Sequence, residues 1–288
     1  MIRSGGVIPA QAGMTADSYG IDQNPMNQSV IVITGASSGI GEQAALQLAQ
    51  RGAQLCLVAR RREELERVQA LVAARGGAAA IYPADLSVEE EVDRCAAAIL
   101  SEHGHADVLV NNAGRSIRRS IRNSLDRDHD FHRTMQINYF AAVRLTMRLL
   151  PRMIERGQGH IVNITSMAVQ AATPGFAAYV ASKYALEGYS RVLAAEMADR
   201  GVQVTVVHYP LVRTPMSSAT EVYRKVRQMS PEQAARWIVR AIDKRPARVG
   251  TLLGEAIETA NVLMPGITAR WTGRVFRYMS KLQRGGIG

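Results

Sequence analysis

The stretch SVIVITGASSGIG, residues 29–41, decides the fold of this chain. Residues 29–34 form an apolar run typical of a parallel strand that is covered on both faces. The three glycines that follow permit a tight turn, and a helix starting there would direct free N–H groups at a pyrophosphate. An ordinary strand–helix turn is the alternative for such glycines taken alone. In this position they predict a nucleotide-binding unit, with cofactor-binding residues Gly35, Ser37, Ser38, Gly39, Ile40 and Gly41.

Beyond this unit, strand-like apolar runs alternate with helix-like segments along the chain. Longer helices are predicted from about residue 128 to 150, from 177 to about 200, and from Ser230 onward, where a capping serine precedes Pro231. Such alternation is typical of right-handed βαβ units. The predicted fold is α/β, a three-layer doubly wound parallel sheet of the Rossmann-like kind. Its further strands are predicted at residues 53–59, 78–86, 106–114, 160–166, 202–209 and 248–251.

Length and composition favour a single domain with two tails. Of the 288 residues, 47% are hydrophobic and 21% are charged, so the chain can bury a core and is not of disordered composition. Two cysteines in apolar stretches and the lack of a secretory pattern favour the reducing cytoplasm. No apolar run reaches the roughly 18 residues that a membrane-spanning helix needs. We expect a poorly ordered N-terminal arm at 1–28, a catalytic domain at 29–254 and a C-terminal extension at 255–288.

The positive charge of the chain is concentrated near its C-terminus. The formal net charge is +10, and residues 244–288 hold eight basic and two acidic side chains, a net charge of +6. No recognition motif accompanies this charge, so nucleic acid is not an expected partner. In the extension, aromatic and basic residues interleave as they do at a membrane interface or in a lipid-binding channel. A terminal helix that packs on the domain or across a dimer is the alternative, and both interpretations stay open.

The end of the second predicted strand bears on the choice of nucleotide. That strand ends in Arg60 and Arg61, and no carboxylate follows until Glu63. Guanidinium groups bind a 2′-phosphate bidentately, whereas a carboxylate there would bind the ribose hydroxyl of NAD. We therefore expect NADP(H), with NAD(H) as the alternative, unless these arginines only begin a solvated helix face. Asp85 and Leu86 end the third strand, where they could reach the adenine, although Asp85 could instead cap a helix.

Three polar residues indicate acid–base chemistry at a carbonyl. Tyr179 and Lys183 are four residues apart, on one face of a predicted helix. A neighbouring ammonium favours the phenolate and so lowers the pKa of a tyrosine. Tyr179 could then exchange a proton with a carbonyl oxygen while a hydride moves, and Ser166, at the end of a strand, could hold the same oxygen. Taken singly, each residue also fits ordinary packing or solvent exposure.

Taken together, these motifs resemble the short-chain dehydrogenase/reductase family. TGASSGIG at 34–41, NNAG at 111–114, Asn138, Ser166 and YVASK at 179–183 occur in that family's order and spacing. The resemblance implies an NAD(P)-dependent enzyme without a metal, forming a homodimer or homotetramer. It also implies that Tyr179 is the acid/base, Lys183 its pKa modulator and ribose ligand, and Asn138 the anchor of a water relay. The remaining cofactor-binding residues it implies are Asn112, Ala113, Gly114, Pro210, Val212 and Thr214, although the family's glycine after the sixth strand is missing here.

Four further stretches resemble the bacterial short-chain fatty acyl-CoA reductases, and one of them is HDFHRTMQINYF at 129–140. RSIRRSI follows the NNAG motif directly, and PLVRTPM with MSPEQAARWIVRAIDKRPARVGTLLG covers 210–216 and 229–254. The resemblance implies NADPH-dependent reduction of a long acyl thioester or another lipid carbonyl. Arginines recognise phosphate, so Arg115, Arg118 and Arg119 would contact the CoA phosphates, unless they form a solvated helix edge or a subunit contact. The stretch 215–230, which includes Met216, would cover the acyl chain.

Two alternative functions remain at this point. One is an NADP-dependent alcohol or ketone dehydrogenase, similar to the hydroxysteroid enzymes and running in oxidation. The other is a dinucleotide-sensing protein without catalysis, which the complete set of Asn138, Ser166, Tyr179 and Lys183 disfavours. No metal site is expected, because the histidine pairs at 103/105 and 129/132 lack an evident third ligand.

Overall fold

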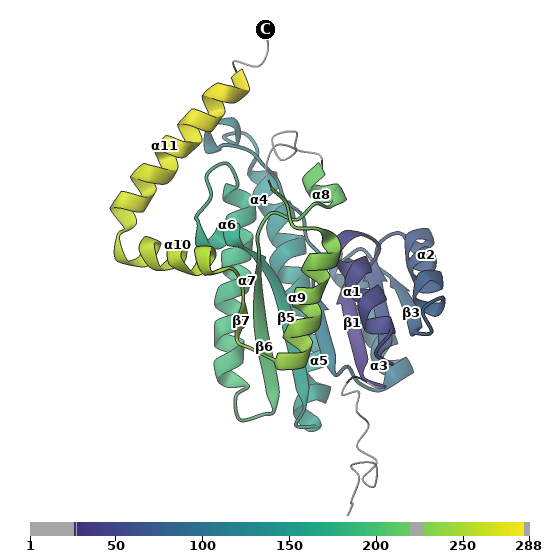
Figure 1. The fold of residues 1–288 in the computed structure, drawn as a ribbon. Helices are drawn as coiled ribbons and strands as arrows, with labels where there is room; N and C mark the ends of the chain where they lie inside the picture. The colour runs from purple at the N-terminus through teal and green to yellow at the C-terminus, as the bar shows by residue number, and fades with distance from the viewer. Residues whose placement is uncertain (1–25, 27, 219–226, 285–288) are drawn as a thin grey trace, which may run out of the picture.

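A seven-stranded parallel sheet forms the centre of the protein (Figure 1). The computed structural model describes residue 26 and residues 28–218 and 227–284, so most of the predicted arm at 1–28 lies outside the described residues. The strand order is β3-β2-β1-β4-β5-β6-β7, which confirms the doubly wound α/β sheet. The strands are β1 (Val30–Thr34), β2 (Gln54–Ala59), β3 (Ala78–Pro83), β4 (Val108–Asn111), β5 (Gly159–Ser166), β6 (Val202–Tyr209) and β7 (Arg248–Val249).

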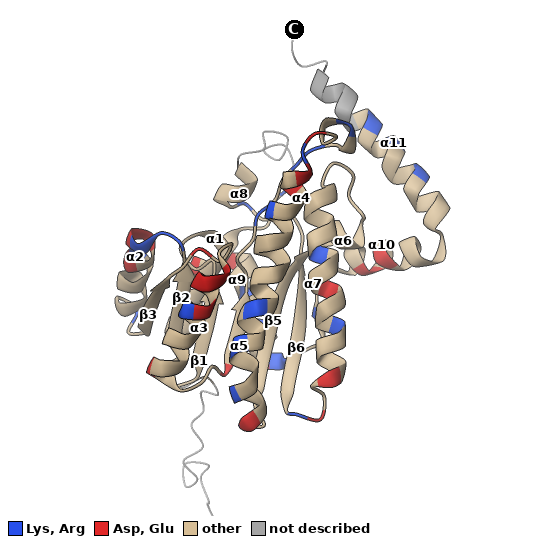
Figure 2. Ribbon diagram, turned by 180° about the vertical axis from the view of Figure 1, so that it is seen from behind, with Lys and Arg blue, Asp and Glu red and all other residues tan. Residues whose placement is uncertain are grey.

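Helices cover both faces of this sheet. One face carries α1 (Gly39–Ala49), α2 (Arg62–Ala73) and α9 (Pro231–Lys244), which Figure 1 shows in front. The other carries α3 (Glu89–His103), α5 (Ala141–Glu155) and α7 (Ala177–Glu196), which Figure 2 shows. Each helix buries an apolar stripe, with Leu48, Ile238, Ile99 and Leu149 among the fully buried side chains. Because both faces are covered, β1 is buried along its whole length, as its continuous apolar sequence predicted.

The strand order reverses between β1 and β4, and this places a crevice at their carboxyl ends. β1 pairs with β2 on one side and with β4 on the other, and the helices that follow leave toward opposite faces. Ligands of open α/β sheets bind at such a reversal. The side chain of Thr34 ties the two strand ends together, since its Oγ1 donates to Val110 O (3.1 Å) and accepts from the backbone N–H of Asn112 (2.9 Å).

The helix expected from about residue 128 to 150 is interrupted. It consists of α4 (Asp128–Met135), a π-helical turn (Gln136–Phe140) and α5, which continues to Glu155. The π turn contains Asn138, whose side chain is buried and hydrogen-bonded to Arg115, after β4, and to Ser182 on α7. π turns of this kind are frequent at functional sites. The helix expected to end near residue 200 stops at Glu196, where α7 ends.

The C-terminal part forms an arm that stands away from the sheet (Figure 1). The Ser230 cap of α9 is confirmed, since Ser230 Oγ accepts from the backbone N–H of Gln233. After β7 come α10 (Leu252–Leu263), which begins within the range assigned to the domain from sequence, and α11 (Pro265–Arg284). The short helices α6 (Met167–Gln170) and α8 (Pro215–Ser218) follow β5 and β6. Within the described residues, no helix is long and apolar enough to cross a membrane.

Candidate active site

The loop between β1 and α1 has the backbone geometry that its glycines allow. Gly35 and Gly39 have positive φ angles of 67° and 60°, a region that favours glycine. Gly41 packs so closely on the loop that a methyl group there would collide with the carbonyl oxygen of Gly35. Gly41 therefore holds α1 against the turn rather than facing a ligand, whereas Gly35 and residues 37–40 line a cavity.

The start of α1 fits a phosphate-bearing cofactor. Ser38 occupies the N-cap position, yet its side chain makes no capping hydrogen bond to the helix. Gly39 and Ile40, the first residues of the helix, line the cavity. A helix N-terminus with uncapped N–H groups and the positive end of the dipole is suited to a pyrophosphate. The residues present therefore fit a dinucleotide.

Two arginines line the same cavity at the end of β2. The guanidinium of Arg60 lies 3.8 Å from a carboxylate oxygen of Asp85, and that of Arg61 lies 3.9 Å from Glu64. Asp85 does not cap α3, which follows Val88; its Oδ1 accepts hydrogen bonds from Ser87 instead. Partial burial raises the pKa of Asp85, but the bonds from Ser87 and the charge of Arg60 outweigh it, so the pKa lies below its usual value. This end of the cavity therefore combines two guanidinium groups with one ionised carboxylate.

Tyr179, Lys183 and Ser166 all line this one cavity. Tyr179 and Lys183 lie on α7, and Ser166 is the last residue of β5. The side chain of Lys183 is buried, and its Nζ donates to the carbonyl oxygen of Ile164 at 2.8 Å. Burial lowers the pKa of Lys183 to about 8. The structure thus brings together the three side chains that the sequence singled out for carbonyl chemistry.

Asn138 is buried and does not itself line the cavity. Its Nδ2 donates to Ser182 Oγ at 2.9 Å, and that hydroxyl donates to the carbonyl oxygen of Tyr179 at 2.7 Å. A Cβ atom built on Gly114 would lie 3.0 Å from Asn138 Oδ1 and 3.5 Å from Lys183 Nζ. Gly114 thus allows the close approach between the end of β4 and α7. Asn138 is hydrogen-bonded both to Arg115, the residue after Gly114, and to Ser182 on α7.

One cavity of about 1100 Å³ connects these groups. Arg115, Arg118 and Met216 line it, whereas Arg119 does not. The Nε of Arg119 donates to the buried carboxylate of Asp130 at 3.1 Å, and its backbone N–H donates to Gly175. Part of the stretch 215–230 lies outside the described residues. The other predicted cofactor residues that line the cavity are Leu86, Asn112, Ala113, Gly114, Pro210, Val212 and Thr214.

Several lining residues were not found from the sequence. His132, Arg133 and Gln136 reach the cavity from α4 and the π turn. Gln136 lies three residues after Arg133 and four after His132, so all three can share one helix face. No local sequence pattern indicates that this face meets the cavity. Arg133 joins Arg115 and Arg118 as a third arginine that lines the cavity, in addition to Arg60 and Arg61 at the end of β2. Thr173 and Phe176, from the loop before α7, also line the cavity, and Phe176 pairs by a backbone bridge with Arg119 of the arginine run.

Comparison with known proteins extends over most of the chain. Residues 29–224 match the sequence profile of the short chain dehydrogenases. A fatty acyl-CoA reductase from Acinetobacter baylyi is 49% identical over 238 residues, which cover 83% of this chain and 81% of that protein. A fatty acyl-CoA reductase from Mycobacterium tuberculosis is 40% identical over 248 residues, 86% of this chain and 83% of that protein. The crystal structure of a short-chain dehydrogenase from Streptomyces avermitilis superimposes with a TM-score of 0.71 at 31% identity, covering 90% of this chain and 98% of that one.

Proposed function

The chain belongs to the short-chain dehydrogenase family, and we propose that it is an NADPH-dependent reductase of long-chain acyl-CoA thioesters. Membership makes it an oxidoreductase that uses a nicotinamide dinucleotide. The substrate class is our inference, and two relatives that carry the name fatty acyl-CoA reductase support it. The observation that carries the proposal is that one cavity joins the glycine loop, Tyr179 and the three arginines Arg115, Arg118 and Arg133.

We propose that the dinucleotide lies in an extended conformation along the cavity, with a different group of residues holding each of its parts. The N-terminus of α1 would bind its pyrophosphate, and Arg60 with Arg61 would bind a 2′-phosphate, which selects NADP(H). Asp85 and Leu86 would contact the adenine. Lys183 donates one hydrogen bond to Ile164, and its other two N–H groups suit ribose hydroxyls. The nicotinamide end would be held by residues 112–114, Pro210, Val212 and Thr214.

The bound cofactor supplies a hydride, and the protein supplies the proton. Ser166 would donate a hydrogen bond to the substrate's carbonyl oxygen, and Tyr179 would transfer its phenolic proton to the same oxygen. The ammonium of Lys183, one helical turn from Tyr179, favours the phenolate that this transfer leaves. At the substrate, the carbonyl carbon gains the hydride and its bond to sulfur breaks. As that bond breaks, the hydroxyl formed by the two transfers returns its proton to the Tyr179 phenolate and becomes the carbonyl group of the aldehyde. The sulfur leaves with the electron pair of the carbon–sulfur bond and takes up a proton from solvent as the free thiol.

Three arginines at one end of the cavity support a substrate that carries phosphates. Arg115, Arg118 and Arg133 line this end, and we propose that they contact the phosphates of coenzyme A. Arg119 would act indirectly by fixing the segment that carries Arg115 and Arg118, through its bonds to Asp130 and Gly175. Typical pockets for one small molecule measure roughly 300–1,000 Å³. A cavity of about 1100 Å³ is only slightly larger, so we propose that the acyl chain extends beyond it when the dinucleotide and the coenzyme A portion are bound.

We also propose that the protein is a cytoplasmic homo-oligomer. Cys56 and Cys95 are both buried and unpaired, which fits a reducing compartment. Exposed apolar side chains on the helices that carry or adjoin the site favour pairing with a second copy across these helices. They are Phe140, Met147, Tyr184 and Val192.

Turnover measured with the purified protein tests the proposed function. NADPH consumption would be followed with a long-chain acyl-CoA, a long-chain aldehyde and a ketone, together with the release of free thiol. We expect NADPH consumption with the acyl-CoA and one thiol released per NADPH oxidised, as the stoichiometry of aldehyde formation requires. Turnover with ketones only, without thiol release, would overturn the acyl-CoA assignment and leave a carbonyl reductase.

A further inference from the structure

The arm formed by α10 and α11 exposes an unusual concentration of apolar side chains. Seventeen large apolar residues are exposed in the described part of the chain, and nine of them lie between residues 252 and 278. Scattered exposed apolar residues are normal, but a concentrated patch marks an interaction surface. The nine residues are Leu252, Leu253, Val262, Leu263, Met264, Ile267, Trp271, Val275 and Tyr278.

On α11 these residues form a stripe. Ile267, Trp271, Val275 and Tyr278 are separated by four, four and three residues, which places them on one helix face. Trp271 and Tyr278 are 62% and 65% exposed. A different face meets the body of the protein, because a Cβ atom built on Gly175 would lie 3.3 Å from the ring of Phe276. The stripe therefore lies on another side of α11 than the contact with Gly175, and its four side chains are exposed.

Arginines border this stripe. Arg270, Arg274 and Arg277 are exposed and separated by four and three residues, on a face next to the apolar one. The helix sequence contains no Asp or Glu, and Figure 2 shows blue patches but no red along α11. An apolar stripe with Trp and Tyr beside a row of arginines is the arrangement of a helix that lies in the interface of an anionic membrane.

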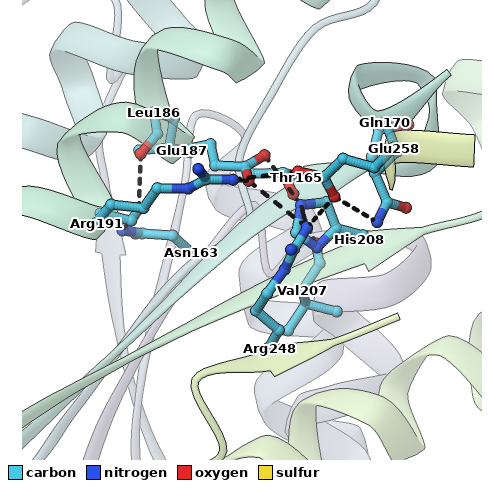
Figure 3. Close-up of polar contacts among 12 residues, drawn as sticks. Asn163, Thr165, Gln170, Leu186, Glu187, Arg191, Val207, His208, Arg248 and Glu258 are labelled. Carbon is cyan, nitrogen blue, oxygen red and sulfur yellow. Dashed lines mark hydrogen bonds and ion pairs between the residues drawn. The ribbon is translucent and has the colours of Figure 1, made fainter. Parts of the chain in front are cut away.

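The base of the arm is fixed to the body by polar contacts (Figure 3). Glu258 of α10 accepts hydrogen bonds from Arg248, from Arg191 (3.2 Å) and from Gln170 (3.2 Å). Glu255 accepts from Gln170 at 3.0 Å and pairs with Arg248 at 3.3 Å. Both carboxylates of α10 are therefore paired with the body and do not offset the positive charge of α11. These contacts fix the position of α10 on the body of the protein. We call the apolar stripe of α11 together with its three bordering arginines the outer face of the arm.

We propose that the outer face of this arm docks on membranes that contain anionic phospholipids. A second copy of the chain fits this face less well, since a symmetric contact would bring the arginines of the two arms together. The apolar residues on α5 and α7 offer a separate surface for self-association. The arm touches Gly175 in the loop whose Thr173 and Phe176 line the cavity, so docking would place the lipid surface beside that end of the cavity.

Tryptophan fluorescence tests the docking directly. The chain has two tryptophans, and Trp237 stacks on Tyr209 with ring centroids 5.6 Å apart. The Trp237→Phe variant leaves Trp271 as the only tryptophan and keeps an aromatic ring in that contact. We expect its emission to shift to shorter wavelength with vesicles of equal phosphatidylcholine and phosphatidylglycerol. With phosphatidylcholine alone the shift should be much weaker. No shift with the anionic vesicles would overturn the proposal.

Charge variants separate docking by the arm from general attraction. Each arginine near an anionic surface is worth about fivefold in binding, so changing Arg270, Arg274 and Arg277 to Gln should weaken vesicle flotation about a hundredfold. The control changes Arg75, Arg94 and Arg240 to Gln, three exposed arginines outside the arm, and lowers the net charge equally. An equal loss with the control set would contradict a specific role of the arm.

Two further variants distinguish membrane docking by the apolar stripe from its contact with a second copy. Trp271→Glu should abolish flotation and leave the oligomeric state unchanged, whereas Val192→Glu, at an exposed position on α7, should leave flotation intact. Conversion of an oligomer to monomers by Trp271→Glu, with no vesicle binding by the parent protein, would show that a second copy covers this face. These measurements use no substrate, so their failure would leave the proposed reductase function untouched.

Discussion

The side chain of Asn138 makes two hydrogen bonds to the backbone of Arg115. Its Nδ2 donates to the carbonyl oxygen of Arg115 at 2.9 Å, and its Oδ1 accepts from the N–H of Arg115 at 2.7 Å. The π turn is thereby joined to the segment that leaves β4 and carries the arginines. Because Asn138 also donates to Ser182, one amide positions the arginine-bearing segment and the helix of Tyr179 together.

Replacing Asn138 should therefore damage both stability and catalysis. Asn138→Ala removes both bonds to Arg115 and leaves the partly buried backbone groups of that residue without these partners. Buried unsatisfied groups cost about 1–3 kcal/mol, so we expect a lower urea midpoint and a loss of kcat/KM. Asn138→Asp keeps the acceptor, but its ionised carboxylate places a buried oxygen against the carbonyl oxygen of Arg115, so this variant should also be less stable than the wild type. Wild-type stability in Asn138→Ala would contradict the positioning role.

The buried Lys183 should make stability depend on pH above neutrality. Burial lowers its pKa in the folded protein to about 8, whereas a lysine in an unfolded chain titrates near 10.4. Between these values the unfolded state binds more protons, so the free energy of unfolding rises with pH there. Lys183→Met removes this dependence. The stability of the wild type relative to the variant should increase by about 2 kcal/mol from pH 7 to pH 10, measured by urea unfolding without cofactor. A constant difference would show that the lysine is not desolvated.

Arg60 should set the preference for NADPH. Loss of a charge-assisted hydrogen bond to phosphate costs about 1.5–3 kcal/mol, or roughly ten- to a hundredfold. We expect Arg60→Ala to raise KM for NADPH by that factor and to leave KM for NADH nearly unchanged. The matched control is Arg62→Ala, since Arg62 is equally exposed, pairs with Glu66 at 3.7 Å and does not line the cavity. Equal effects of the two variants would argue against a 2′-phosphate contact by Arg60.

Arg118 and Arg133 should distinguish acyl-CoA from a thioester without phosphates. Changing either to Ala should raise KM for a long-chain acyl-CoA about tenfold. KM for the same acyl group on N-acetylcysteamine, which lacks the phosphates, should change little. Arg122→Ala serves as the control, because Arg122 belongs to the same run of arginines but does not line the cavity. The same increase for both thioesters would mean that the arginines act on something other than the phosphates.

Much of the fold and of the site could be predicted from the sequence, because it depends on local patterns. The strands are continuous apolar runs, the phosphate loop is marked by its glycines, and Tyr179 and Lys183 share a helix face through their spacing. The π turn could not be predicted. It is held by hydrogen bonds from Asn138 to residues 23 and 44 positions away, and no local sequence pattern reports these partners.

The arginine run shows a second limit of sequence reasoning. Arg118 and Arg119 are neighbours, yet one lines the cavity and the other pairs with the buried Asp130. Asp130 lies eleven residues further along, at the start of α4, and only the packing of that helix decides which guanidinium reaches it. Arg133, which sequence reasoning missed, is brought to the cavity by the same helix. Both outcomes depend on tertiary contacts that residue types alone do not specify.

The most direct test of the account is the turnover of a long-chain acyl-CoA with NADPH by Tyr179→Phe. The substitution removes one hydroxyl from the cavity wall and keeps the ring that packs edge-on against Phe176. If Tyr179 supplies the proton, kcat/KM should fall by about 10²–10⁴, while NADPH binding, measured by fluorescence titration, stays near the wild-type value. Retention of wild-type turnover with thiol release would contradict the role of Tyr179 and, with it, the mechanism built on this cavity.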